Sequence, residues 1–162
     1  MNQRWVLALL CAAALHSSPF AIAAAGDERR DVRIDVDQLQ RVTDELRRRL
    51  TILERVLFTA VVHNPLVMSV ETLSGRSGPF VITADADFVR SLNDEELKAA
   101  IAHELGHVWI YTHHPYLQTE RLANDIAMRV VNRSAFEPVY AKVWARTGIR
   151  GDLIEFIGPP SP

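Results

Sequence analysis

The sequence predicts an α+β domain that is mostly helical, with a small β-hairpin or sheet ahead of one central helix. Apolar residues recur every three or four positions along several segments, which is the spacing of amphipathic helices. Two short β-branched or apolar runs are separated by a segment rich in glycine and serine, as in a hairpin or two strands of a small sheet. The helical runs are residues 36–62, 94–112, about 117–130 and 134–147, and the strand-like runs are 67–73 and 79–83.

Capping residues mark where these helices begin and end. Asp35 precedes the first run, which we expect to be one long helix that ends before Pro65, because a residue before proline is disfavoured in a helix. Asn93 and Glu96 form a capping box at the start of the central helix. Ser134 and Glu137 have the same capping-box spacing at the start of the last helix.

Residues 1–25 have the form of a secretory signal peptide. Arg4 gives a short positive start, residues 5–15 are an apolar core, and residues 21–25 offer small side chains for cleavage. The apolar run is too short to span a bilayer. The only cysteine, Cys11, lies in this segment, so the mature chain would hold no disulfide. We therefore expect one domain, residues 26–162, that is periplasmic or secreted and has no stable membrane span.

The charge of the chain is mildly acidic. The formal net charge is -2 at pH 7, and loss of Arg4 with the signal peptide would make it -3. A binding surface for nucleic acid or for an anionic membrane normally carries a positive balance. This balance argues against nucleic acid as a partner.

The central helix carries the motif H-E-x-x-H at residues 103–107. On a helix His103 and His107 lie one turn apart on the same face, so both can offer a nitrogen to one cation. Glu104 lies about 100° further round, from where its carboxylate can reach a water bound to that cation. The motif therefore predicts a zinc site with Glu104 as general base. Small side chains on this helix, notably Gly106, would let another helix approach it closely.

A catalytic zinc needs a third protein ligand, and two residues compete for that place. His113 stands at the spacing of the third histidine in H-E-x-x-H-x-x-G-x-x-H, but Ile110 occupies the position where that pattern requires glycine. Glu120 begins the next helical run. Asn124 lies one turn beyond it, placed to accept a hydrogen bond from the far nitrogen of a ligand histidine.

Residues 82–107, ITADADFVRSLNDEELKAAIAHELGH, resemble the strand, loop and active-site helix of the gluzincin metallopeptidases that include the CAAX prenyl endopeptidase, the HtpX-type proteases and soluble periplasmic relatives. The later E-x-x-A-N-x-x-A, which begins at Glu120, is similar to E-x-x-A-D-x-x-A of that family. It departs by having Asn124 in place of aspartate, and by a connection of only twelve residues after His107. In both respects it resembles the ImmA/IrrE-type peptidases. The resemblance implies a zincin-like fold and one zinc on His103, His107 and Glu120, with Glu104 as base.

The motif and the resemblance together predict a zinc endopeptidase of the cell envelope that acts on a peptide or protein substrate. By resemblance, the substrate would lie as an added strand along a sheet edge, for which residues 79–83 are the candidate. The alternative is a non-catalytic, zinc-stabilised module that docks on an envelope protein. The candidate donors to a reaction oxyanion are Tyr111, His113, His114, Tyr116 and Tyr140.

Overall fold

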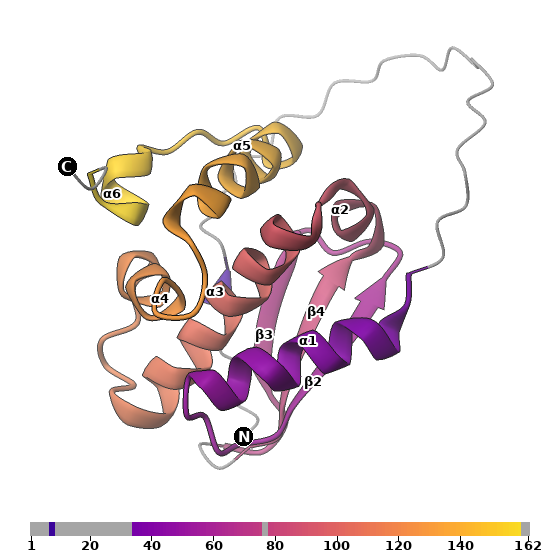
Figure 1. Ribbon diagram of the computed structural model, residues 1–162, viewed down its shortest axis with the longest axis vertical. Coiled ribbons are helices and arrows are strands. Elements are labelled where there is room, and N and C mark those ends of the chain that lie inside the picture. Colours follow the sequence, from indigo (N-terminus) through magenta and orange to yellow (C-terminus); the bar gives the residue numbers. More distant parts are fainter. Residues whose placement is uncertain (1–6, 9–33, 76–77, 160–162) are drawn as a thin grey trace.

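The structure is a computed structural model that describes residues 7–8, 34–75 and 78–159 (Figure 1). It confirms an α+β fold in which a small sheet precedes the central helix. The predicted signal peptide lies outside the described residues except for Leu7 and Ala8, which form β1. The other elements are α1 (Val36–Arg49), β2 (Val56–Val61), β3 (Met68–Thr72), β4 (Phe80–Asp85), α2 (Ala86–Ser91), α3 (Asp94–His113), α4 (Glu120–Ala127), the 3₁₀ helix η2 (Arg133–Ala135), α5 (Phe136–Thr147) and α6 (Leu153–Ile157).

The sheet has the order β1-β3-β4-β2. β3 and β4 pair antiparallel, as the hairpin prediction requires, and β2 pairs parallel with β4 from Val56 opposite Phe80 to Val61 opposite Asp85. β1 adds two residues, antiparallel, at the outer edge of β3. No helix among the described residues is both long enough and apolar enough to cross a membrane.

The prediction of one helix over residues 36–62 is wrong in its second half. α1 ends at Arg49, Thr51 adopts a positive φ of 56°, and the chain continues as β2. The apolar residues of this segment fit the spacing of a helix as well as the alternation of a strand. A helix would bury Leu53, which is 89% exposed, whereas the alternating residues Val56 and Phe58 are buried. Pairing with β4 satisfies the backbone of this β-branched segment, and only the tertiary structure supplies that partner.

The prediction that residues 79–83 form the sheet edge is also wrong, because β4 lies between β3 and β2. The outer edge of β2 is covered by α1, since the Gln40 side chain donates to the Val56 carbonyl and accepts from the Phe58 amide, both at 2.9 Å. The opposite edge of the sheet is that of β3, where among the described residues only Leu7 and Ala8 of β1 pair.

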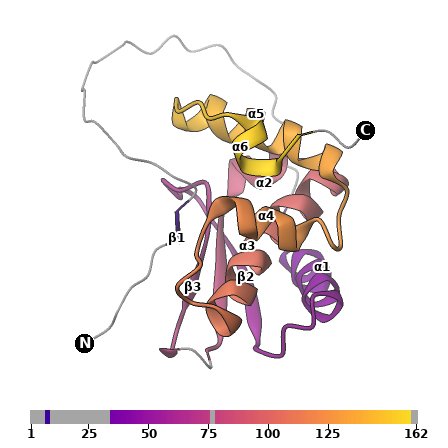
Figure 2. The same ribbon diagram turned by 90° about the vertical axis from the view of Figure 1, so that its left-hand side faces the viewer.

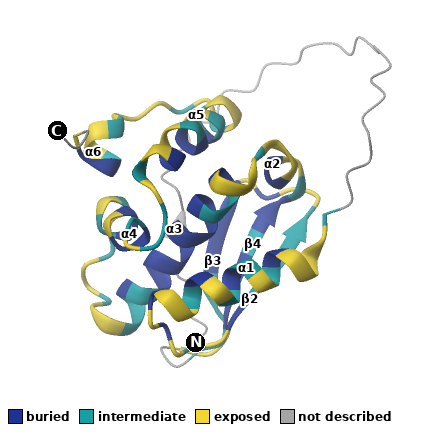
Figure 3. Cartoon of the chain, viewed as in Figure 1, coloured by how far each residue is buried: buried dark blue, intermediate teal, exposed yellow. Residues whose placement is uncertain are grey.

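α3 runs through the middle of the domain. It contacts α1 and the sheet on one side and α4 and α5 on the other (Figures 1 and 2). Every residue from 99 to 108 is buried, so the apolar residues and the polar motif of this stretch are both enclosed by the neighbouring elements (Figure 3). The predicted capping box is confirmed, because Asn93 accepts from the Glu96 amide and the Glu96 carboxylate accepts from the Asn93 amide.

The C-terminal helices depart from the prediction in two ways. Ser134 does not cap α5, because the chain enters that helix through η2 and makes no side-chain cap there. α6 forms in the segment that we expected to be only an apolar tail. Gly148 ends α5 in the left-handed conformation, with φ of 71°, as the sequence predicts.

Asp85 joins the sheet to α2 and α5. Its carboxylate is 9% exposed and accepts hydrogen bonds from the Phe88 amide, the Asn64 amide and Arg146. Burial alone would raise the pKa of Asp85, but these donors and the Arg146 charge outweigh burial and hold the pKa below the ordinary value of an aspartate. A carboxyl with a lowered pKa stabilises the fold above its unfolded-state pKa, and that contribution is lost as the pH falls through the folded-state pKa.

Replacing Asp85 by asparagine is therefore expected to lower the free energy of unfolding by about 1–3 kcal/mol near neutral pH. The difference from the unmodified protein should begin to shrink below about pH 4, where the carboxyl of the unfolded chain takes up a proton, and should disappear once the pH falls below the lowered folded-state pKa of Asp85. Urea unfolding between about pH 7 and pH 3 measures this. The exposed neighbour Asp87 is the control, and Asp87→Asn should have little effect at any pH. A pH-independent loss in Asp85→Asn would contradict the electrostatic role.

Candidate metal centre

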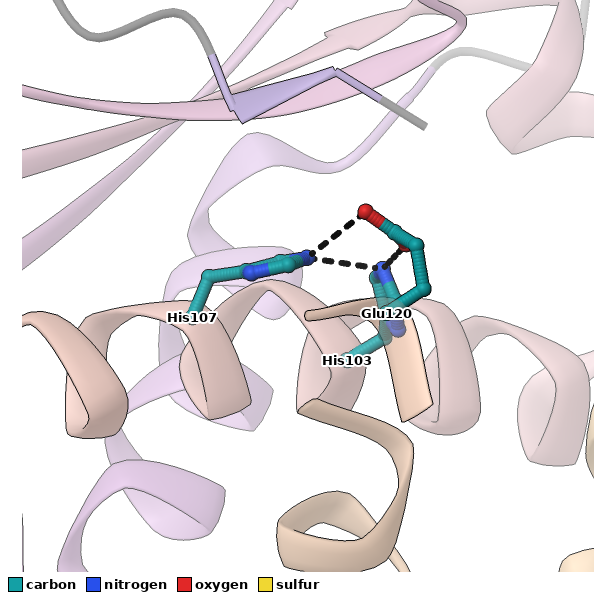
Figure 4. A group of neighbouring side chains, drawn as sticks. All are labelled: His103, His107 and Glu120. Atoms are coloured by element: carbon teal, nitrogen blue, oxygen red, sulfur yellow. Dashed lines mark hydrogen bonds and ion pairs between the residues drawn. The ribbon is translucent and has the colours of Figure 1, made fainter. Parts of the chain in front are cut away.

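Three side chains from α3 and the start of α4 converge with their ligand atoms facing one another (Figure 4). Nε2 of His103 lies 3.2 Å from Nε2 of His107. Glu120 places one carboxylate oxygen 3.2 Å from His103 Nε2 and the other 3.6 Å from His107 Nε2. Both histidines are buried, and the Glu120 side chain is 14% exposed. The tertiary structure thus brings Glu120 to the two histidines of the motif.

Hydrogen bonding behind His103 fixes which of its nitrogens carries the proton. The Asn124 Nδ2 group lies 3.0 Å from the Phe156 carbonyl oxygen, which can only accept, so Nδ2 must face it. The Asn124 Oδ1 atom then faces His103 Nδ1 at 2.8 Å, and His103 Nδ1 must donate. The Tyr140 hydroxyl also accepts from Asn124 Nδ2, at 2.6 Å. His103 therefore directs the lone pair of Nε2 into the cluster.

His107 is oriented in the same way by a different residue. The Gln118 side-chain nitrogen lies 3.3 Å from the His107 carbonyl oxygen, which can only accept. This turns the Gln118 side-chain oxygen toward His107 Nδ1, at 3.2 Å, so that Nδ1 donates and Nε2 again carries a lone pair. A hydrogen-bond acceptor on the far nitrogen is the usual arrangement for a histidine that binds a metal.

The cluster thus consists of acceptors alone: two imidazole lone pairs and a carboxylate. At separations of 3.2–3.6 Å such atoms repel one another unless a cation or a proton lies between them. Ligands about 2.0–2.1 Å from a tetrahedral zinc are about 3.3–3.4 Å apart, which is close to the three separations observed. The donor set and its spacing therefore fit a divalent metal ion held by two imidazoles and one carboxylate.

The two carboxyl groups of the site have opposite electrostatic environments. Burial raises the pKa of Glu104 to about 8; the His107 charge opposes this and the Glu120 charge adds to it. One Glu104 oxygen, Oε2, is buried without a hydrogen-bond partner in the described part of the chain. Burial would also raise the pKa of Glu120, but where a proton takes the place of a cation in the cluster, hydrogen bonds and charge from His103 and His107 outweigh burial and hold the pKa well below the ordinary carboxyl range. Glu120 is thus the charged partner of the histidines, and Glu104 stands beside them with an oxygen free to accept.

Gly106 sets the distance between α3 and α4. A Cβ atom on Gly106 would lie 2.4 Å from the Ala123 carbonyl oxygen and 3.0 Å from the Ala123 Cα. This confirms that a small residue in the motif lets another helix approach closely. Because Glu120 begins α4 one turn before Ala123, this contact also fixes how far the Glu120 carboxylate reaches toward the histidines.

The structure places the other candidate residues away from the three ligand atoms. His113 is exposed and stacks on Trp109, with ring centroids 4.2 Å apart, so it does not join the cluster. Tyr111 packs edge-on against Phe80. Tyr116 is 92% exposed, and Tyr140 lies behind His103 on the far side of Asn124. His114 is exposed near Trp109.

Three residues that complete the polar network, Gln118, Phe156 and Tyr140, were not predicted in that role from the sequence. Gln118 lies in the connection before α4, and the Phe156 carbonyl belongs to α6, 32 positions beyond Asn124. The sequence suggests Tyr140 only as a candidate donor to a reaction oxyanion, whereas its hydroxyl accepts a hydrogen bond from Asn124. None of the three stands at a recognisable spacing from the motif, so no local pattern signals them.

The fold and the cluster define an α+β protein with a buried site suited to a metal ion. The chain matches no protein-family model, no curated protein and no solved structure.

Proposed function

We propose that this protein is a zinc-dependent endopeptidase with a zincin-like fold of the gluzincin kind. The observation that carries the proposal is the convergence of three acceptors from His103, His107 and Glu120, with Glu104 next to them. Two histidines and one glutamate leave a coordination position for water, which is typical of catalytic rather than structural zinc sites. A purely structural site normally fills all four positions with protein ligands and has no use for an adjacent base.

A bound zinc would lower the pKa of its water to about 7 and polarise the substrate carbonyl. In the proposed reaction Glu104 accepts a proton from the attacking water through its free carboxylate oxygen. The water oxygen first bonds to the carbonyl carbon, and the carbon–nitrogen bond of the peptide then breaks as Glu104 delivers the proton to the leaving amine. Asn124 and Gln118 keep both imidazoles in the tautomer that binds metal.

The substrate is proposed to pair with the outer edge of β3, in place of the edge first expected at residues 79–83. This edge already accepts an antiparallel strand, because Leu7 and Ala8 pair there opposite Val70 and Ser69. Main-chain hydrogen bonds of this kind recognise an extended peptide whatever its sequence. The proposed setting is the cell envelope or the space outside it, in keeping with the predicted signal peptide.

The first test is the metal content of the purified protein after reconstitution with zinc. We expect one zinc per chain. Glu120→Ala should weaken zinc binding by more than the roughly 10–100-fold typical of removing an outer hydrogen-bond partner, because it deletes a ligand. His113→Ala is the matched control and should keep the zinc, since His113 lies on Trp109 outside the cluster.

Two results would contradict this assignment. Loss of zinc in His113→Ala with retention in Glu120→Ala would point to a third ligand other than Glu120. An unmodified protein that takes up no zinc would remove the metal site altogether. The alternative function is a non-catalytic envelope module, which the small size of the chain suggests. A protein that binds zinc but cleaves no peptide would favour it.

A further inference from the structure

A small apolar cavity lies beside the candidate metal centre, between α3 and α5. Its walls include Phe136, Val139 and Val143 of α5, Ala100 of α3, Phe88 of α2 and Met68 of β3. We call it the α5 cavity. It has room for roughly one water molecule or one methyl group.

The α5 cavity is continuous with the site proposed for catalysis. His103 and Glu104 line it, so it opens next to the group that would activate the water. Met68, at the start of β3, lines it as well, so it lies against the helix-facing side of the strand along which the substrate is proposed to pair. Alternate side chains of a strand paired along β3 point toward the helices. One of them, next to the bond under attack, would therefore face this cavity.

The chemistry of the walls selects the occupant. The surface that the walls present to the cavity is apolar, and the Tyr140 hydroxyl is engaged by Asn124, from which it accepts a hydrogen bond. An acidic side chain would face Glu104, and any charged side chain would lose its hydration without a counter-charge to replace it. A large aromatic side chain exceeds the space. A methyl or small aliphatic group loses only its contact with water, which is favourable.

On the basis of the proposed endopeptidase function, we propose that the α5 cavity binds the side chain of a substrate residue next to the scissile bond and selects alanine or another small aliphatic residue there. α5 is held rigidly enough to enforce this choice. Lys142 on α5 forms an ion pair with Glu96 at the start of α3, and Arg146 bonds to Asp85 at 2.8 Å. The cavity wall is thus fixed to α3, which carries the motif, and to the end of β4.

The test is cleavage of a mixed peptide library by the zinc-loaded protein, with the products sequenced on both sides of each cut. We expect alanine, with fewer valines, at one position beside the cut, and almost no charged or large aromatic residues there. Val143→Ala enlarges the cavity and should raise kcat/KM for leucine relative to alanine peptides roughly ten-fold or more. Val139→Ala, on the same wall, should shift the preference in the same direction.

Val89→Ala is the matched control, because Val89 is a buried helical valine outside the cavity walls. It should leave the leucine-to-alanine ratio unchanged. Cleavage without any preference beside the cut would overturn this inference and leave the endopeptidase proposal standing. So would a preference that neither Val143→Ala nor Val139→Ala alters. No cleavage of any peptide by the zinc-loaded protein would overturn both.

Discussion

Replacing Glu104 by glutamine is expected to abolish measurable peptidase activity while the protein keeps its zinc. Glutamine has nearly the same size, so it fills the same buried space, but it cannot accept the proton of the attacking water. Removal of a general base typically lowers kcat by about 10²–10⁴-fold. Zinc content should stay at one per chain, because the ligand atoms belong to His103, His107 and Glu120. Peptide hydrolysis and metal analysis on the same sample measure both quantities.

The control for this variant is Glu95→Gln, which makes the same chemical change at an exposed position of α3. It should leave both activity and zinc unchanged. If Glu104→Gln kept full activity, Glu104 could not be the base. If it lost zinc together with activity, the carboxylate would be holding the metal site in place rather than acting on water.

Replacing Gly106 by alanine is expected to destabilise the protein and to disturb the metal site. The new Cβ would meet the Ala123 carbonyl oxygen at 2.4 Å, and this atom is backbone that cannot rotate away. α4 must then shift, and Glu120 moves with it. We expect a loss of about 1–3 kcal/mol in the free energy of unfolding and a marked loss of zinc affinity, although alanine favours helix more than glycine does.

Denaturant unfolding and zinc titration of Gly106→Ala test this directly. Lys98→Gly provides a comparison on the exposed face of the same helix, because it lowers helix stability by about 1 kcal/mol without touching α4. It should keep the affinity for zinc. Normal zinc affinity in Gly106→Ala would mean that Glu120 does not depend on the close contact between the two helices.

Local sequence determined the positions of helix ends that have a capping residue. The capping box of Asn93 and Glu96 begins α3, and Gly148 ends α5 in a left-handed conformation, because each signal involves residues only a few positions apart. The same is true of the two motif histidines, whose shared face follows from helical spacing alone. The contact at Gly106 could be anticipated because glycine in a helix interior is costly without a packing reason.

Residues 50–61 could not be assigned from sequence, because their apolar positions fit a helix as well as a strand. The choice depends on β4, which lies some 24 positions further on and provides the hydrogen bonds that make a strand stable. The sheet edge was predicted wrongly for the same reason. Because β2 pairs with β4, β4 lies inside the sheet and cannot be an edge strand.

Sequence by itself thus determined the α+β class, the central helix and the chemistry of its motif. Only the tertiary structure decided that Glu120 rather than His113 meets the histidines, and that the Gln118 side chain and the Phe156 carbonyl fix their tautomers. The physical reason is that a ligand cluster depends on how helices cross and how closely they pack. Those distances are set by contacts such as that between Gly106 and Ala123, which join residues far apart in the chain.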